Sequence, residues 1–211
     1  MFTGAMPKPV VAQVQRLLDL DSAREVYVCC SGSFRVEQML RQAAPRARVV
    51  SNDVSLVSCM LGTLAATGEV PAVTFRGALA WMEEATSNEP IDRIAAVFVA
   101  WQMSRFTGKS EYAALHHLHY RVDFGRYHAK VKENVRQLLG TLRVDAFNAV
   151  DFRVHAREGI ERGATVIAFP PTYRGGYERM YRFLDANISW AAPNYDVFDP
   201  ATVGTWIASL D

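Results

Sequence analysis

The feature that most constrains the fold is an apolar, β-branched run that ends in a turn of small residues and leads directly into a helical pattern. The run covers 24–30, the turn is Ser31-Gly32-Ser33, and residues 34–44 have the spacing of an amphipathic helix. A second apolar run at 48–52 is followed by Asp53. Small residues let the backbone approach a ligand, and a carboxylate after the second strand accepts hydrogen bonds from ribose hydroxyls. This order therefore predicts a nucleoside site.

Only one glycine of the three-glycine dinucleotide pattern is present, at Gly32. Three glycines suit a diphosphate pressed against the start of a helix. A single small-residue turn with an acidic second strand better suits a nucleoside without phosphates, such as S-adenosylmethionine (SAM). The alternative is an ordinary strand-helix-strand unit whose glycine serves only the turn.

Composition places the chain among ordinary globular proteins. It has 211 residues, of which 50% are hydrophobic and 21% charged, which suits a single α/β domain over 1–211. No apolar stretch is long enough to span a bilayer, so we expect no membrane association. Three cysteines, Cys29, Cys30 and Cys59, make no disulfide framework and favour a cytoplasmic location.

Strand and helix patterns alternate along the chain. Strands are predicted at 24–30, 48–52, 144–152 and 164–169, with a fifth at 195–199; a mainly helical insertion at 71–142 lies between the second and third strands. The alternation predicts a Rossmann-like, doubly wound, mainly parallel α/β sheet. The Gly32 turn, Asp53, Asp151 and Pro170-Pro171 all follow predicted strands. In such sheets, ligands bind at the carboxyl ends of the strands.

The insertion is rich in basic residues. Between Arg105 and Arg143 there are eight Lys or Arg and three acidic residues, so the segment is expected to face phosphates. The candidates for nucleic-acid contact are Arg121, Arg126, Lys130, Lys132 and Arg136. A solvated helical face is the alternative explanation. The same segment holds His116, His117 and His119, but their spacing and the lack of accompanying cysteines or carboxylates predict no metal site.

A second motif follows the fourth strand at Phe169-Pro170-Pro171-Thr172-Tyr173. Two prolines lack N–H groups and fix φ, so they form a rigid protrusion with outward carbonyls. Such a turn can accept hydrogen bonds from an amino group, and the nearby tyrosine can stack on a base. Taken alone, the motif is better explained as a strand terminator followed by a loop tyrosine.

The order of glycine turn, acidic second strand and Pro-Pro-x-aromatic loop resembles the class I SAM-dependent methyltransferases. More narrowly, it resembles the DNA enzymes that methylate amino groups. Segments 2–9, 51–55 and 169–178 together are similar to phage proteins described as antirestriction DNA adenine methyltransferases. The resemblance implies SAM as cofactor and DNA as partner, in a phage or antirestriction context.

The resemblance also implies roles for individual residues. The turn would hold the methionine part of SAM and Asp53 its ribose, while the Pro-Pro loop would receive a flipped adenine. The implied cofactor residues are Cys30, Ser31, Gly32, Ser33, Phe34, Asn52, Asp53 and Asp151. The implied catalytic residues are Phe169, Pro170, Pro171, Thr172 and Tyr173.

Two departures from the family pattern leave alternatives open. Phe169 stands where the family has Asp, Asn or Ser, and Thr172 precedes Tyr173; either Thr172 or Asp151 supplies the polar contact, or methyl transfer is lost. The alternative function is thus a catalytically inactive DNA- or protein-binding module, and a third is a SAM enzyme acting on a small molecule or protein. Five strands are predicted against seven in the family, so the last two are expected to be absent, rearranged, or supplied by a second copy of the chain in a homo-oligomer or by a C-terminal partner segment.

Overall fold

The computed structural model describes residues 8–17, 23–106, 110–170 and 177–210. The chain divides into two compact units. The first takes its described residues from 1–68, 141–174 and 192–211, and the second takes them from 69–140 and 175–191.

The first unit contains a four-stranded parallel sheet in the order β4-β2-β1-β5. Its strands are β1 (Glu25–Cys29), β2 (Arg48–Asn52), β4 (Ala146–Asn148) and β5 (Thr165–Ala168). Its helices are α1 (Lys8–Leu17), α2 (Arg35–Ala43), α3 (Leu56–Thr67), α8 (Phe152–Glu161), the 3₁₀ turn η2 (Pro200–Thr202) and α10 (Val203–Ala208). The predicted Rossmann-like α/β class is therefore confirmed.

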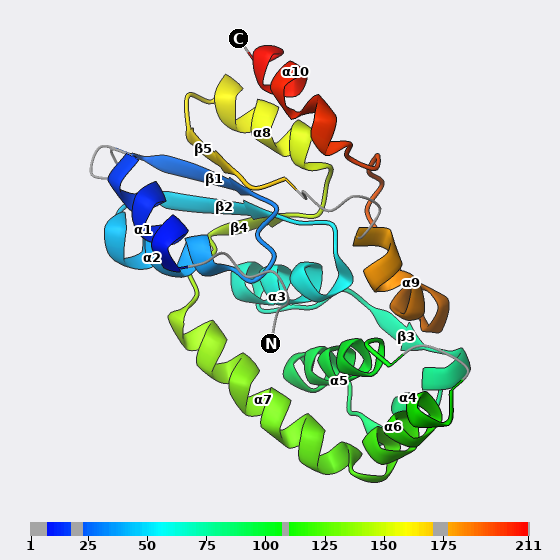
Figure 1. The fold of residues 1–211 in the computed structure, drawn as a ribbon. Helices are drawn as coiled ribbons and strands as arrows, with labels where there is room; N and C mark the ends of the chain where they lie inside the picture. The colour runs from blue at the N-terminus through cyan, green and yellow to red at the C-terminus, as the bar shows by residue number, and fades with distance from the viewer. Residues whose placement is uncertain (1–7, 18–22, 107–109, 171–176, 211) are drawn as a thin grey trace. The chain divides into compact units, whose positions relative to one another are not determined.

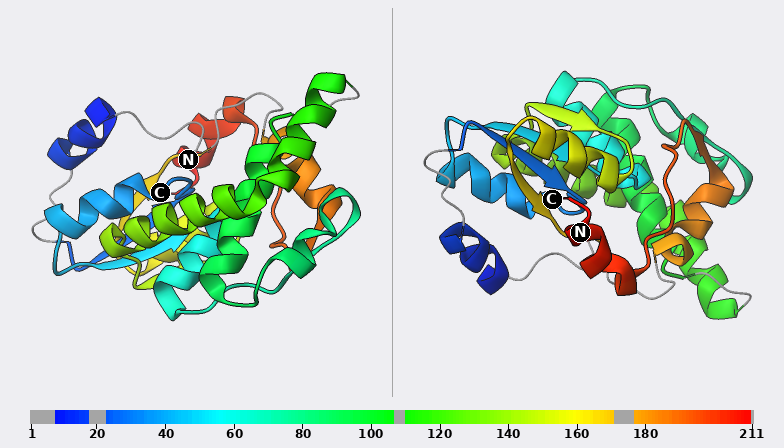
Figure 2. Two further views of the ribbon diagram at one scale, coloured as in Figure 1. Left: turned by 90° about the horizontal axis from the view of Figure 1, so that it is seen from below. Right: turned by 90° about the horizontal axis from the view of Figure 1, so that it is seen from above.

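The helices cover both faces of this sheet because strand side chains alternate in direction. Val26 and Val28 of β1 pack with residues of α2 in one buried cluster. Tyr27 and Cys29 face the other way: the Tyr27 ring lies 4.8 Å from that of His155 on α8, and Cys29 packs in a cluster with Phe152. Figure 1 shows α2 and α3 on one side of the strands and α8 on the other, and Figure 2 shows α8 over the strands from above.

Helix α3 is defined by its own capping residues. The Ser55 hydroxyl accepts a hydrogen bond from the Ser58 N–H at its start, and Gly68 ends it with a left-handed φ of 80°. Within the helix, Gly62 lies against the ring of Phe147 on β4, where an added Cβ would come within 2.1 Å of the ring. The contact between α3 and β4 therefore depends on the absence of a side chain at position 62.

Replacing Gly62 by alanine is expected to destabilise the protein by about 1–3 kcal/mol, because the Phe147 ring must be displaced from a packed contact. Urea unfolding measures the change. The matched control is Gly125→Ala on α7, where nothing lies within 4 Å of the added Cβ and helix propensity favours alanine by up to ~1 kcal/mol. A double variant that also carries Phe147→Leu should recover part of the loss, and equal losses with and without the leucine would contradict the steric explanation.

The second unit is mainly helical and also contains a small antiparallel ribbon of β3 and β6. Its elements are β3 (Val73–Phe75), the 3₁₀ turn η1 (Gly77–Leu79), α4 (Met82–Ala85), α5 (Pro90–Met103), α6 (Glu111–Val122), α7 (Phe124–Thr141, ending just beyond the unit), α9 (Tyr177–Asn187) and β6 (Ile188–Trp190). Helix α5 is almost wholly buried from Ile94 to Met103. No helix in the described part of the chain combines the length and the apolar character needed to cross a bilayer.

The prediction of a strand at 195–199 is wrong. Residues 191–199 form no helix or strand, because their groups are used elsewhere: the Asp196 N–H donates to Asp151, and the Phe198 ring packs edge-on against Phe152 at 5.1 Å. The third predicted strand forms only at Ala146–Asn148. Strands β3 and β6 were not predicted.

Candidate cofactor and substrate site

The turn after β1 has an unusual backbone. Three alternate residues have left-handed φ values, Cys30 at 60°, Gly32 at 51° and Phe34 at 58°. This conformation is free of penalty for glycine but costs about 1–2 kcal/mol for other residues. Strain of this kind collects where a backbone is shaped for a ligand.

Hydrogen bonds fasten this turn to the segment that follows β2. The Ser31 N–H donates to the Asn52 carbonyl at 2.8 Å, and the Gly32 N–H donates to Asp53 Oδ2 at 2.8 Å. The Ser58 hydroxyl on α3 donates to the Gly32 carbonyl at 3.0 Å. The carboxyl ends of β1 and β2 are therefore joined into one edge.

Asp53 is the acidic group at this edge. Its side chain is nearly buried, and its Oδ1 accepts hydrogen bonds from the N–H groups of Val54 and Ser55, each at 2.8 Å. These bonds, with that from Gly32, fix the carboxylate beside the turn. A nucleoside seated on the turn would therefore meet the Asp53 carboxylate.

The start of α2 has no side-chain cap. Its N-cap residue is Phe34, whose ring is buried against Phe147 and cannot accept a hydrogen bond. The first N–H groups of a helix lack partners within it and attract negatively charged ligand groups. The turn and the first residues of α2 thus fit a small ligand that carries a carboxylate.

Two more predicted site residues lie at the same edge. The Asn52 side-chain NH₂ donates to the carbonyls of Asn148 and Val150 at 2.9 and 2.6 Å, linking β2 to the end of β4. Asp151 begins α8. Burial raises the pKa of the Cys30 thiol well above its usual range, and the charges of Asp53 and Asp151 raise it further. The structure therefore brings both carboxylates close to Cys30, and this thiol stays protonated.

Asp151 already has several partners. Its carboxylate accepts from the Arg153 N–H and Nε, each at 2.9 Å, and from the Asp196 N–H at 3.2 Å. Burial would raise the pKa of Asp151, but the hydrogen bonds and the charge of Arg153 outweigh it and lower that pKa. Asp151 thus holds the start of α8 and the segment around Asp196 in place.

The Pro-Pro loop is described only at its beginning. The Phe169 N–H faces the Cys29 carbonyl at 3.4 Å, and the Phe169 side chain packs against the apolar cluster between α2 and the sheet. Pro170 is partly buried. The predicted catalytic residues Pro171, Thr172 and Tyr173 lie outside the described residues.

The predicted nucleic-acid residues all belong to the second unit and differ in their surroundings. The Arg121 guanidinium lies over the Trp81 ring, and Arg126 pairs with Asp123 at 3.3 Å. Lys132 pairs with Asp92. Lys130 and Arg136 are exposed on α7.

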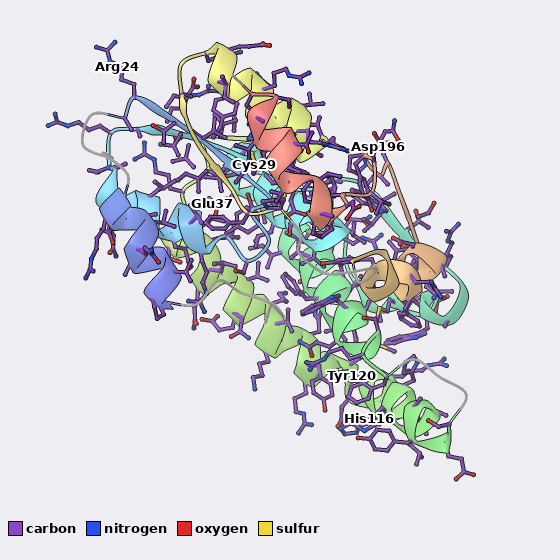
Figure 3. All side chains as sticks on the ribbon, turned by 45° about the horizontal axis from the view of Figure 1, so that its top comes forward. Arg24, Cys29, Glu37, His116, Tyr120 and Asp196 are labelled. Carbon is purple, nitrogen blue, oxygen red and sulfur yellow. The ribbon has the colours of Figure 1, made fainter. Side chains whose placement is uncertain are left out.

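The histidines of α6 make aromatic and backbone contacts. The His116 ring stacks on Phe106 at 4.1 Å, the His117 Nε2 lies 3.2 Å from the Met103 carbonyl, and His119 contacts the Tyr127 hydroxyl at 2.8 Å. In the ranges that the structure describes, no group of three or more His, Cys, Asp or Glu could hold a metal ion. Figure 3 labels His116 and Tyr120 of this helix.

One polar group near this edge was not predicted from the sequence: Glu37, on the first turn of α2. Its side chain is completely buried. Glu37 does not stand out in the sequence of α2, which also contains two arginines and two glutamines. An acidic residue in the first turn of a helix ordinarily faces solvent, so no sequence signal marked it. Ser51 of β2 is buried as well.

Comparison with known proteins agrees with this architecture. A family model described as Phage DNA Adenine Methylase-like domain 1 matches residues 2–210. No curated protein and no solved structure matches the chain. Since the family model covers nearly the whole chain, the protein belongs to the phage DNA adenine methylase-like family.

Proposed function

We propose that this protein binds SAM and transfers its methyl group to the exocyclic amino group of adenine in DNA. The observation that carries the proposal is the Asp53 carboxylate, held 2.8 Å from the Gly32 nitrogen at the joined carboxyl ends of β1 and β2. A carboxylate beside a small-residue turn is what a nucleoside requires, and the family supplies the methyltransferase context.

The residues of the turn fit SAM. The uncapped start of α2 would hold the methionine carboxylate, and the backbone of residues 30–34 would lie against the methionine chain. Asp53 would accept hydrogen bonds from the ribose hydroxyls, with Asn52 and Asp151 completing the edge of the site. When bound, SAM supplies an activated methyl group on a sulfonium, so the reaction itself needs no metal.

DNA would be bound through two kinds of group. Pro170, Pro171 and Tyr173 would receive a flipped adenine, with stacking on the tyrosine offsetting part of the unpairing energy. Thr172 would supply the polar contact that orients the amino nitrogen. The basic residues of the second unit, above all the exposed Lys130 and Arg136, would contact phosphates, so affinity for DNA should fall steeply with salt.

One observation favours a second function, that of a non-catalytic relative that keeps the fold. Phe169 stands where amino-methylating enzymes have a polar residue, and its side chain packs into the apolar cluster. It cannot accept a hydrogen bond from an adenine amino group. If no other residue replaces this contact, the protein would bind DNA or a protein without transferring a methyl group.

The phage setting suggests the biological role. Methylation of phage DNA would protect it from restriction enzymes that cut unmodified sites, and this antirestriction activity would be exerted in the cytoplasm of the host. Whether a second copy of the chain or a separate segment extends the sheet stays a prediction.

Calorimetry with SAM and with its demethylated product S-adenosylhomocysteine (SAH) tests the cofactor. We expect Asp53→Ala to weaken binding of both roughly 10- to 100-fold, because hydrogen bonds to a charged group contribute about 1.5–3 kcal/mol. The control is Glu161→Gln, an acidic residue exposed on α8, which should bind as the wild type does. Unchanged affinity in Asp53→Ala would contradict the proposed site.

A labelled-methyl assay on unmodified duplex DNA then separates the two functions. Transfer that is lost in Tyr173→Ala supports the enzyme. SAM binding without transfer supports the non-catalytic relative. Absence of binding to DNA even at low salt contradicts the DNA methyltransferase and leaves only the protein-binding form of the second function.

A further inference from the structure

A fully buried acid lies directly behind the cofactor turn. Glu37 is 0% exposed, and in the described structure neither of its carboxyl oxygens has a hydrogen-bond partner. The hydroxyls of Ser31 and Ser51 are buried without partners in the same way. Figure 3 labels Glu37 on α2, where the helix packs against the strands. A buried carboxyl group without partners is unusual and calls for an explanation.

Glu37 lies on α2, the helix that packs on an apolar cluster over the sheet. Elements α1, α2, β1, β2 and β5 contribute the side chains of the cluster between α2 and the sheet, including Val14, Val26, Val49 and Ile167. Among the residues that the structure describes, Asp53 is the charged side chain whose electrostatic interaction affects the pKa of Glu37. Within these same ranges, no cation is placed to neutralise a negative charge at this position.

Burial raises the pKa of Glu37 to about 7. The Ser31 hydroxyl, the N–H of Glu37 itself and the Ser51 hydroxyl lie near enough to favour the charged form, although none of them completes a hydrogen bond to the carboxyl group. The negative charge of Asp53 favours the protonated form. Near neutral pH, Glu37 is therefore balanced between its two charge states.

Glu37 is connected to the turn through one residue. Ser31, whose hydroxyl acts on Glu37, immediately precedes Gly32, whose N–H is bonded to the Asp53 carboxylate. A ligand seated on this turn would lie near both acids. Because both side chains are buried, solvent would screen their charge only weakly.

We infer that Glu37 sets the charge of the cofactor pocket: as a carboxylate it favours the sulfonium-bearing SAM over the uncharged thioether SAH, and once protonated it does not. This inference rests on the proposed function. Because Glu37 is completely buried, it would act on the ligand through its charge, as a specificity-determining residue. Its effect discriminates between cofactor and spent product, two molecules of nearly the same shape.

Linkage gives the direction of the effect. A cationic ligand binds the ionised form of Glu37 better, so its affinity rises as pH increases through the pKa of that group. The uncharged sulfur of SAH has no such preference. For a unit charge at a separation on the order of 10 Å and an effective dielectric constant of about 20, Coulomb's law gives a change in affinity of about tenfold.

The experiment measures the affinities of SAM and SAH by calorimetry between about pH 6 and pH 8. For the wild type, we expect the preference for SAM over SAH to rise about tenfold across this range. Glu37→Gln should remove the rise. The amino group of the ligands titrates alike in both proteins, so it cancels in the comparison. The control Glu161→Gln removes an exposed carboxylate and should keep the wild-type profile.

A second variant keeps the test decisive if Glu37→Gln folds poorly. Ser51→Ala retains Glu37 but removes a hydroxyl that favours its charged form, so the rise should move to higher pH. An NMR titration that follows the carboxyl carbon of Glu37 without ligand should also give a higher pKa for Glu37 in Ser51→Ala than in the wild type.

The outcomes separate this inference from the proposed function. Failure of SAM and SAH to bind at any pH overturns the proposed function itself. Binding of both with the same pH profile in the wild type and in Glu37→Gln overturns the inference alone, as does a Ser51→Ala profile that does not move.

Discussion

Replacing Glu37 by glutamine is expected to stabilise the folded protein by about 3 kcal/mol at pH 8 and to change its stability little at about pH 4. The pKa of Glu37 is about 7 in the folded protein, against 4.5 for a glutamate that is not buried. A raised pKa means that the folded state binds the proton more tightly than the unfolded state. The stability contributed by this group is therefore present below the unfolded pKa and is lost as pH rises through 7.

Urea unfolding at several pH values measures this effect. The difference in unfolding free energy between Glu37→Gln and the wild type should grow between about pH 4.5 and pH 7 and then level off. Glu161→Gln, at an exposed position of α8, should show no such growth. A constant difference at all pH values would mean that Glu37 is not buried as the structure places it.

The second large effect concerns His155, which lies on the opposite face of the sheet. The ring is completely buried, with Nε2 3.3 Å from the Val50 carbonyl and Nδ1 3.2 Å from the side-chain nitrogen of Asn148. These partners require a proton on Nε2 and a lone pair on Nδ1, so the ring is neutral. Burial lowers the pKa of His155 to about 4.

Acidification should therefore weaken the wild type by about 3 kcal/mol through this group as pH falls from about 6.5 to about 4. A lowered histidine pKa means that the unfolded state binds the proton first. In His155→Gln, which offers a donor and an acceptor but does not titrate, this loss should be absent. Urea unfolding measures the difference in unfolding free energy between each variant and the wild type, which should grow for His155→Gln as pH falls from about 6.5 to about 4. The control His119→Gln lies on the exposed surface of α6 and should show no such growth; a constant difference for His155→Gln would contradict the assignment.

The two buried groups oppose each other. Rising pH adds the penalty of ionising Glu37 while it removes the penalty of protonating His155, so their sum changes little between about pH 4.5 and pH 6.5. A flat wild-type profile is thus expected from these groups. In Glu37→Gln, the unfolding free energy should show the pH dependence that comes from His155. In His155→Gln, it should show the pH dependence that comes from Glu37.

Much of the first unit follows from local sequence. The β-branched run of β1, the helix start after Phe34 and the capped helix between Ser55 and Gly68 each carry their own signal, and the structure contains all three. The proximity of Asp53 to Gly32 also follows, because the carboxyl ends of adjacent parallel strands meet.

The remaining features depend on distant contacts. Strands β3 and β6 have three residues each and pair across more than a hundred positions, so neither has a local pattern to mark it. The run at 195–199 contains Tyr, Val and Phe, which favour strands. In the structure, however, the Asp196 N–H donates to Asp151 at the start of α8, and Phe198 packs against Phe152. The burial of Glu37 depends on where α2 lies on the sheet, which its charged sequence does not disclose.

The strand order has a consequence for synthesis on the ribosome. Strand β1 pairs with β2 on one side and with β5, more than a hundred residues later, on the other. While the chain grows, one edge of β1 has no pairing partner until Thr165–Ala168 of β5 have emerged. Likewise, β3 cannot pair until Ile188–Trp190 of β6 have emerged. The nascent polypeptide therefore carries an open hydrophobic edge until these residues have emerged, and a chaperone that shields such edges could bind there.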